Sequence, residues 1–229
     1  MIKNILLDLD DTIFDFKKAE AVAVSKTLRE LGIEPTDEIV SLYSSINQAQ
    51  WKLLELGELT RDRIRVRRYE LLFKELGADL DPLKASDIYA DFLSQGHYYV
   101  NHAHEMLEQL HGTYRLYIAS NGFRKIQRGR IASSDLDSFI SDYFLSEEVG
   151  SEKPSREFFA YCLEHISGAN KANTAIVGDS LTSDIKGGEA FGIPTVWFNP
   201  RKSANTTPVT PNKPVTTTKP ANSNVITTD

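Results

Sequence analysis

Short apolar runs alternate along this chain with longer segments of helical periodicity. Five short runs predict strands, at residues 2–9, 115–120, 143–146, 174–178 and 195–198. After residue 120 the segments between them predict helices, at residues 123–133, 155–166 and 182–191. Strands that alternate with helices favour a parallel sheet with helices on both faces. The pattern therefore predicts an α/β protein with a doubly wound, Rossmann-like core.

One long stretch interrupts this alternation. Residues 16–98 contain only helical patterns, with helices predicted at 15–31, 37–56, 61–76 and 82–98. Gly32 ends the first of these helices, and Gly57 and Gly77 separate the later ones. Because this block lies between the first and second predicted strands, we expect an all-helical cap (16–98) inserted into a catalytic core (1–15 and 99–200).

The chain ends in a segment of different composition. Residues 201–229 are mostly Thr, Pro and Asn and contain almost no apolar side chains. Such a segment buries too little surface to offset the entropy of ordering it. We therefore expect a disordered tail, with a short edge strand at residues 225–226 as the alternative.

Carboxylates gather at the end of the first predicted strand. Asp8, Asp10 and Asp11 follow the apolar run directly, and strand alternation points Asp8 and Asp10 to the same side. Clustered like charges repel one another, so such a group is expected where a cation binds or a carboxylate reacts. Ser120 and Asp179 end two other predicted strands. Because ligands of open α/β sheets bind beyond the carboxyl ends of the strands, these side chains should converge.

Four motifs together resemble the haloacid dehalogenase-like hydrolases. In order they are Asp-Leu-Asp-Asp-Thr at 8–12, Ser-Asn-Gly at 120–122, Lys-Pro at 153–154 and Gly-Asp-Ser-Leu-Thr-Ser-Asp at 178–184. Each lies beside the predicted element that the family requires, and the resemblance covers residues 1–200. Singly these residues are explained by turns, helix caps or solvated charges, whereas four in the right order are specific.

The resemblance implies phosphoryl transfer at the end of the first strand. Asp8 would be the nucleophile that forms an aspartyl-phosphate, and Asp10 would be the general acid and then the base that activates water. Mg²⁺ would be held by Asp8, by the backbone carbonyl of Asp10 and by Asp179. Dehalogenating members lack an acid at the position of Asp10, because halide leaves without a proton. The resemblance therefore favours phosphate-ester hydrolysis.

The other motifs imply groups that bind the phosphoryl oxygens. Ser120 would donate a hydrogen bond to one oxygen, with the backbone amide of Asn121 beside it. Lys153 would neutralise the charge of the phosphoryl group and of the nucleophile. Asp184 would orient either a metal-bound water or Lys153.

The predicted cap bears on the substrate. Residues 46–60 and Arg68-Tyr69-Glu70 resemble the pyrimidine 5′-nucleotidase branch of the family. Trp51 is a candidate to stack on a base, with packing inside the cap as the alternative, and Arg68 is a candidate to face the site. Other small-molecule phosphatases, for sugar phosphates or phosphoglycolate, and phosphomutases remain open. A phospho-acceptor domain or a metabolite-binding regulatory protein is the non-enzyme alternative, although the former has no such cap.

The composition of the chain limits the kinds of molecule that it is expected to bind. The chain has 229 residues, 41% of them hydrophobic and 25% charged, with a formal net charge of −6. That balance argues against a nucleic-acid polymer but allows a small anionic ester. A single cysteine, Cys162, excludes an internal disulfide, and no stretch is long and apolar enough to cross a membrane. We expect a cytoplasmic monomer or weak dimer.

Overall fold

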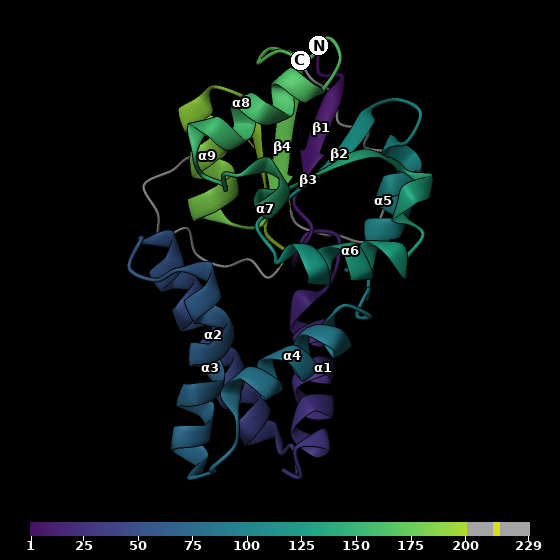
Figure 1. The fold of residues 1–229 in the computed structure, drawn as a ribbon. Helices are drawn as coiled ribbons and strands as arrows, with labels where there is room; N and C mark the ends of the chain where they lie inside the picture. The colour runs from purple at the N-terminus through teal and green to yellow at the C-terminus, as the bar shows by residue number, and fades with distance from the viewer. Residues whose placement is uncertain (201–212, 216–229) are drawn as a thin grey trace.

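Six parallel strands form one sheet in the computed structural model of the protein, which describes residues 1–200 and 213–215 (Figure 1). The strand order is β3 (Ile140–Leu145), β2 (Arg115–Ser120), β1 (Asn4–Leu7), β4 (Thr174–Gly178), β5 (Thr195–Phe198) and β6 (Lys213–Val215). Leu7 at the end of β1 lies opposite Ile118 of β2 and Val177 of β4. The register thus brings the carboxyl ends of three central strands to one edge.

Helices cover both faces of the sheet, as the alternating pattern predicts. They are α5 (Ala103–Leu110) and α6 (Arg124–Ala132) on one face, and α8 (Arg156–His165) and α9 (Lys186–Phe191) on the other. The single-turn helices α7 (Ser146–Val149) and Leu136–Ser138 flank β3. Ile5 and Leu7 pack with Leu107 of α5, whereas Leu6 between them packs with Phe158 of α8. Period-two alternation along β1 therefore supplies both halves of the core.

The helical block forms a separate bundle beyond the carboxyl edge of the sheet (Figure 1). Its helices are α1 (Phe16–Glu30), α2 (Asp37–Glu55), α3 (Arg61–Leu76) and α4 (Pro82–Leu93). At the start of each helix, a side-chain oxygen accepts the proton of a first-turn backbone amide; the accepting residues are Asp15, Thr36, Thr60 and Asp81 respectively. The bundle has its own apolar cluster, which includes Val24, Leu28, Tyr43 and Leu72.

Two short linkers join the cap to the core, side by side. The backbone amide of Asp15 donates to Tyr98 O at 2.7 Å, and the amide of Val100 donates to Ile13 O at 2.9 Å. The predicted helix 82–98 ends five residues early, at Leu93. The amides of residues 94–96 close a turn on the end of the helix, and the chain then bonds to the incoming linker from Tyr98 onward. The helix α5 was missed by the sequence analysis. None of the helices in the described part of the chain is long and apolar enough to span a membrane.

Part of the C-terminal segment adds to the sheet. The strand β6 pairs in parallel with β5, from Lys213 opposite Val196 to Val215 opposite Phe198. For these three residues the expectation of a disordered tail is wrong, because the exposed edge of β5 offers backbone groups that an extended segment pairs with, whatever its side chains. Residues 225–226, the alternative edge strand, lie outside the described residues.

Candidate active site

A cavity of about 250 Å³ lies between the cap and the carboxyl edge of the sheet. It is lined by every residue to which the sequence analysis assigned a role in the site: Asp8, Asp10, Trp51, Arg68, Ser120, Asn121, Lys153, Asp179 and Asp184. The core residues lie at or just after the ends of β1, β2 and β4, in the turn Leu181–Ile185 or in the loop before α8. The other two come from α2 and α3. The expected convergence of the strand ends is therefore observed as geometry.

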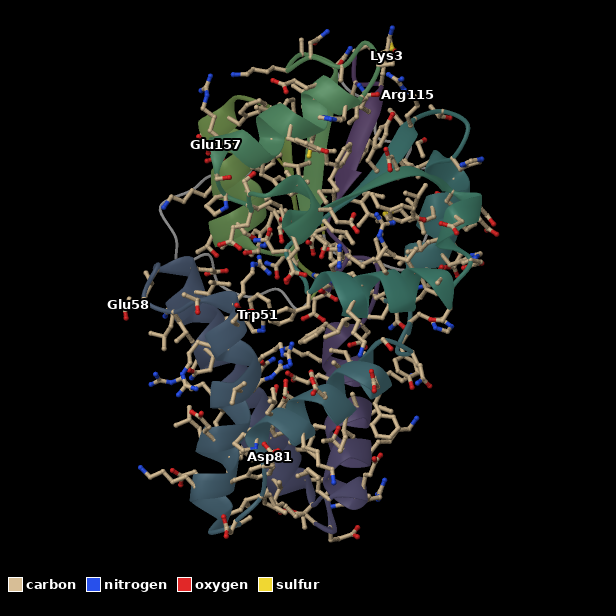
Figure 2. All side chains as sticks on the ribbon, in the orientation of Figure 1. Lys3, Trp51, Glu58, Asp81, Arg115 and Glu157 are labelled. Atoms are coloured by element: carbon tan, nitrogen blue, oxygen red, sulfur yellow. The ribbon has the colours of Figure 1, made fainter. Side chains whose placement is uncertain are left out.

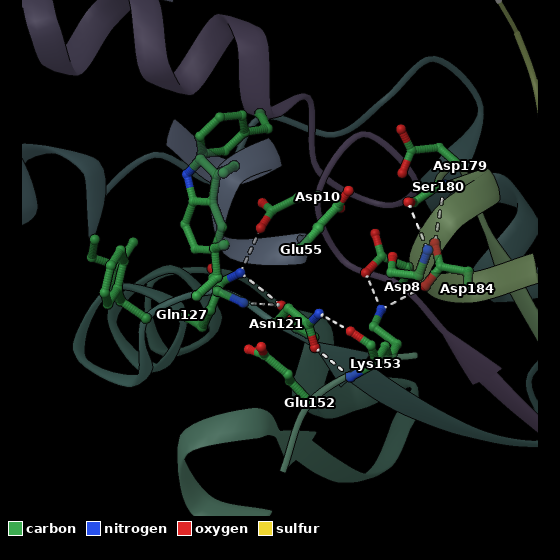
Figure 3. Close-up of a pocket in the computed structure, with 18 of the residues that line it drawn as sticks. Asp8, Asp10, Glu55, Asn121, Gln127, Glu152, Lys153, Asp179, Ser180 and Asp184 are labelled. Carbon is green, nitrogen blue, oxygen red and sulfur yellow. Dashed lines mark hydrogen bonds and ion pairs between the residues drawn. The ribbon is translucent and has the colours of Figure 1, made fainter. Parts of the chain in front are cut away.

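Lys153 is the centre of the charged end of the cavity (Figure 3). Its Nζ donates to Asp8 Oδ1 at 2.6 Å, to Asp184 Oδ1 at 2.7 Å and to Ala119 O at 2.5 Å. All three ammonium protons are thus used by protein oxygens. Burial alone would lower the pKa of Lys153, but the charges of Asp184 and Asp8 outweigh it and raise the pKa above its ordinary value.

The carboxylates around this lysine repel one another. Burial raises the pKa of Asp8 to about 7; Lys153 opposes the rise, and the charges of Asp184 and Asp10 add to it. Burial and the charges of Asp8 and Asp184 raise the pKa of Asp179 well above its ordinary range. Carboxylate oxygens of Asp8, Asp179 and Asp184 all lie within 4.8 Å of one another. Such a group gains stability from a bound cation.

Asp184 is held in place by the turn that follows β4. Its Oδ2 accepts the backbone amide proton of Ser180 at 3.1 Å, while its Oδ1 accepts from Lys153. The segment Leu181–Ile185 forms a π-helical turn ahead of α9, where the sequence analysis predicted one continuous helix. A Cβ atom at Gly178 would lie 2.1 Å from Asp184 Oδ2, so only glycine fits there. Both oxygens of Asp184 are therefore occupied by protein donors.

Asn121 has a contact that the sequence analysis did not foresee. Its side-chain amide donates to Lys153 O at 2.8 Å, and its Oδ1 accepts the backbone amide proton of Lys153 at 3.0 Å. These two bonds fix the backbone from which the Lys153 side chain extends. The carbonyl of Asn121 in turn accepts a proton from Arg61 Nη1 of the cap at 2.6 Å.

Four charged or amide side chains of the cavity wall were missed by the sequence analysis: Glu55, Gln127, Arg130 and Glu152. Gln127 and Arg130 both contact Asp10. With Glu55 and Glu152 counted, carboxylates along the cavity outnumber the cations, which are Arg68, Arg130 and Lys153. This excess of negative charge fits a divalent cation as a further component of the site.

The cap end of the cavity is apolar. Phe16, Trp51, Leu54, Leu93, Phe123 and Ile126 line it. The Trp51 ring lies 5.5 Å from the Phe123 ring at an interplanar angle of 59°, and the Arg61 guanidinium lies 5.8 Å from the Trp51 centroid. Figure 2 shows Trp51 at the end of the cap nearest the core, with Asp81 farther from the core. Trp51 thus packs against a core side chain and faces the cavity at once.

Arg68 is buried among tyrosine rings. Its guanidinium lies 4.5 Å from the Tyr89 centroid, and its Nη1 donates to Asn47 Oδ1 at 3.1 Å. Asn47 in turn donates to the buried carboxylate of Glu20 at 2.6 Å. Within the described residues, Arg68 Nε and Nη2 have no hydrogen-bond acceptor. The sequence analysis predicted that Arg68 faces the site, and the structure places it in the cavity wall.

Comparison with known proteins gives a family and two kinds of relative. A model of the haloacid dehalogenase-like hydrolases matches residues 2–192. The HAD-hydrolase YfnB of Bacillus subtilis is 37% identical over 209 residues, which are 91% of this chain and 89% of that protein. Its magnesium-bound crystal structure matches with a TM-score of 0.89 at 36% identity, over 93% of this chain and 94% of that one.

Two further relatives have names that state a substrate. The pyrimidine 5′-nucleotidase PynA of Streptococcus pneumoniae is 36% identical over 210 residues, 91% of this chain and 89% of that protein. A glyceraldehyde 3-phosphate phosphatase of Methanopyrus kandleri is 26% identical over 203 residues, 86% of this chain and 83% of that protein. The relatives thus include enzymes for a nucleotide and for a sugar phosphate.

Proposed function

This chain belongs to the haloacid dehalogenase-like hydrolases, and we propose that it is a magnesium-dependent phosphatase of pyrimidine nucleoside 5′-monophosphates. The family match confirms the predicted family, fold and enzyme class, and the chain is a phosphatase of that family. One observation carries the finer proposal. A single cavity joins the cluster of Asp8, Lys153 and Asp179 to an aromatic chamber around Trp51 and Phe123.

In the proposed first step, a carboxylate oxygen of Asp8 attacks phosphorus. A bond forms between that oxygen and phosphorus while the ester P–O bond breaks, and Asp10 gives its proton to the leaving alcohol oxygen. In the second step Asp10 takes a proton from water, whose oxygen attacks phosphorus. The bond to Asp8 breaks, which releases inorganic phosphate and restores the carboxylate. Both acids line the cavity, which supports this assignment.

Two side chains are proposed to hold the phosphoryl oxygens. Ser120 Oγ accepts protons from the Gly122 amide at 3.1 Å and from Gln127 Nε2 at 2.9 Å. Those bonds leave the Ser120 hydroxyl proton to be donated to a phosphoryl oxygen. Lys153 bonds to Asp8 Oδ1 and so places its positive charge beside the proposed nucleophile, where negative charge collects during transfer.

The donor set fits magnesium. Asp8 and Asp179 would hold the ion, with the backbone carbonyl of Asp10 as the third protein ligand that the family resemblance implies. Bound there, the ion would neutralise phosphoryl charge and orient substrate oxygens. Asp184 has both oxygens engaged by Lys153 and by the Ser180 amide, so its proposed task is to hold the lysine.

The aromatic chamber is proposed to bind the base. A pyrimidine ring has two apolar faces and polar edges, so it needs aromatic surface and a few donors. Trp51 and Phe123 supply the surface, and two guanidinium nitrogens of Arg68 have no acceptor among residues 1–200 and 213–215. A second candidate is a sugar-phosphate phosphatase, because the relative from Methanopyrus kandleri is one.

The first experiment is phosphate release from pyrimidine nucleotides, purine nucleotides and sugar phosphates, with Mg²⁺ and with EDTA. We expect turnover only with the metal, highest kcat/KM for a pyrimidine monophosphate, and a loss of at least about 10⁴-fold in Asp8→Asn. Preference for a sugar phosphate would select the second candidate. No release from any ester by folded protein would instead favour a phosphomutase or a binding role.

Trp51→Ala separates base recognition from chemistry. We expect kcat/KM for the pyrimidine monophosphate to fall by about 10-fold, the size of one lost stacking contact, and that for p-nitrophenyl phosphate to stay within roughly 2-fold. An equal loss for both esters would show that Trp51 only packs the cap against the core.

A further inference from the structure

A buried arginine links the proposed acid Asp10 to the cap. Arg130 of α6 is fully buried, and its Nη1 forms an ion pair with Asp10 Oδ1. Its Nε donates to Gly96 O at 2.7 Å, in the linker that leads from α4 back to the core. We propose that Arg130 is a positioning residue that fixes the orientation of Asp10 and ties it to this linker.

Gln127 completes the hold on Asp10. One helical turn before Arg130, its Nε2 donates to Asp10 Oδ2 at 2.6 Å and to Ser120 Oγ at 2.9 Å. Its Oε1 accepts from Arg130 Nη1 at 3.0 Å, so the two side chains also fix each other. A Cβ atom at Gly122 would lie 2.1 Å from Gln127 Nε2, so the glycine makes room for this amide. Asp10 therefore has a donor on each oxygen.

The orientation that results keeps Asp10 usable. Its side chain remains 29% exposed and lines the cavity, although both oxygens are bonded to α6. When Asp10 is protonated, the oxygen that carries the proton can still accept one of these bonds while it donates the proton into the cavity. A carboxylate with free rotation would spend little time facing the leaving oxygen, whereas one held between two donors is preorganised.

The hydrogen bond from Arg130 to Gly96 O connects the residues that hold Asp10 to the cap linker. α6 lies where the cap meets the core (Figure 1), and a Cβ atom at Gly129 would lie 2.7 Å from Ser94 Cβ and 2.8 Å from Ser94 O. The helix and the linker therefore touch at the level of their backbones. A movement of this linker would pull on the same guanidinium that holds Asp10.

This inference rests on the proposed role of Asp10, and leaving-group dependence tests it. p-Nitrophenol leaves as a stable anion without a proton, whereas an alcohol needs one. The experiment compares Arg130→Met with wild type by rapid-mixing measurement of the first step. The substrates are p-nitrophenyl phosphate and the alkyl phosphate ester that wild type hydrolyses fastest. We expect a fall of about 100-fold for the alkyl ester and less than about 3-fold for p-nitrophenol release, followed by slow phosphoenzyme hydrolysis.

Two further variants make each outcome decisive. Asp10→Asn should show the same selective loss, and if it does not, the proposed function of Asp10 fails rather than the role of Arg130. If Asp10→Asn is selective and Arg130→Met lowers both first-step rates equally, Arg130 is merely structural and the inference is overturned. Arg130→Lys keeps a cation but not the planar fork, so it should fold and show a smaller selective loss. It decides the question if the methionine variant does not fold.

Discussion

Two of the three buried cations that line the cavity, Lys153 and Arg68, are compensated in different ways. Lys153 in the core and Arg68 in the cap are each only 2% exposed. Lys153 gives all three of its protons to oxygens of Asp8, Asp184 and Ala119. Within the part of the chain that the structure describes, Arg68 makes one hydrogen bond, to Asn47, and otherwise lies against aromatic rings. The core therefore fixes a charge completely, while the cap keeps donors unused.

This difference assigns separate tasks to the two ends of the cavity. A cation with every proton bonded to protein acts as a fixed charge, which suits the same reacting group in any ester. A buried cation with spare donors costs stability unless something accepts them, and a ligand can do so. Variants of Lys153 should thus affect all substrates alike, and variants of Arg68 should discriminate among them.

The largest expected effect comes from removing the core cation. Lys153→Met should lower kcat for every phosphate ester by on the order of 10³-fold, because charge on the phosphoryl group is no longer neutralised. It should also lower the free energy of unfolding by about 3 kcal/mol, since Asp8 and Asp184 lose their shared partner. Urea unfolding and steady-state rates measure the two effects. A loss of kcat confined to one class of substrate would contradict the assignment of Lys153 to a step common to all esters.

Removing the cap cation should have a smaller and selective effect. Arg68→Met is expected to lower kcat/KM for the preferred nucleotide by about 10- to 100-fold, because donors to the base are lost. Hydrolysis of p-nitrophenyl phosphate should stay within roughly 2-fold. Arg65→Met is the matched control, because Arg65 lies on the same helix and pairs with Asp87 at the exposed surface. Equal losses for both substrates would assign Arg68 to cap folding alone.

The carboxylates at the charged end of the cavity should also make the stability of the protein depend on pH when metal is absent. The pKa of Asp8 rises from 3.8 to about 7 on folding, so between these values the folded state binds more protons than the unfolded state. Stability in EDTA should therefore fall as pH rises from about 4 to about 7, and Tm should be several degrees lower at pH 8 than at pH 5. Mg²⁺ should raise Tm more at pH 8. A smaller metal effect at pH 8 than at pH 5 would contradict this.

The smallest effect is expected from a change outside the cavity, in the C-terminal segment. Deletion of residues 202–229 removes β6, the strand at the edge of the described sheet, whose three residues pair with β5. Turnover should stay within roughly 2-fold, and Tm should fall by a few degrees at most. Loss of the folded state, measured by circular dichroism, would show that this segment supports the sheet far more than one short edge pairing does.

Site residues at the ends of strands were predictable from the sequence, whereas site residues on the buried face of a helix were not. Asp8, Ser120 and Asp179 follow apolar runs, so their common edge is a consequence of parallel topology. Gln127 and Arg130 lie in a segment with four basic residues between 124 and 130, which resembles a solvated helix. Their three-residue spacing puts them on one face, but only the packing of α6 against the cap linker shows that this face is buried.

In the cap, too, the helices were predictable from the sequence but the contacts between elements were not. Its helices were predictable because each has a cap residue and an amphipathic pattern, and the error at residues 94–98 arose where a linker bonds to another linker. Among five arginines of α3, the sequence analysis named Arg68 as the one to face the site. Its partners Asn47 and Glu20 were not foreseen, because they come from two other helices.

The adjacent linkers have an evolutionary consequence. Because the chain enters and leaves the cap through two linkers that are hydrogen-bonded to each other, Asp15 to Tyr98 and Val100 to Ile13, the whole bundle is a single insertion between β1 and β2. A replacement bundle that begins and ends at these points would leave the strand register unchanged. Descendants of one ancestral enzyme can therefore diverge in substrate specificity through replacement of one contiguous segment of the gene. A laboratory chimera can be built by the same exchange.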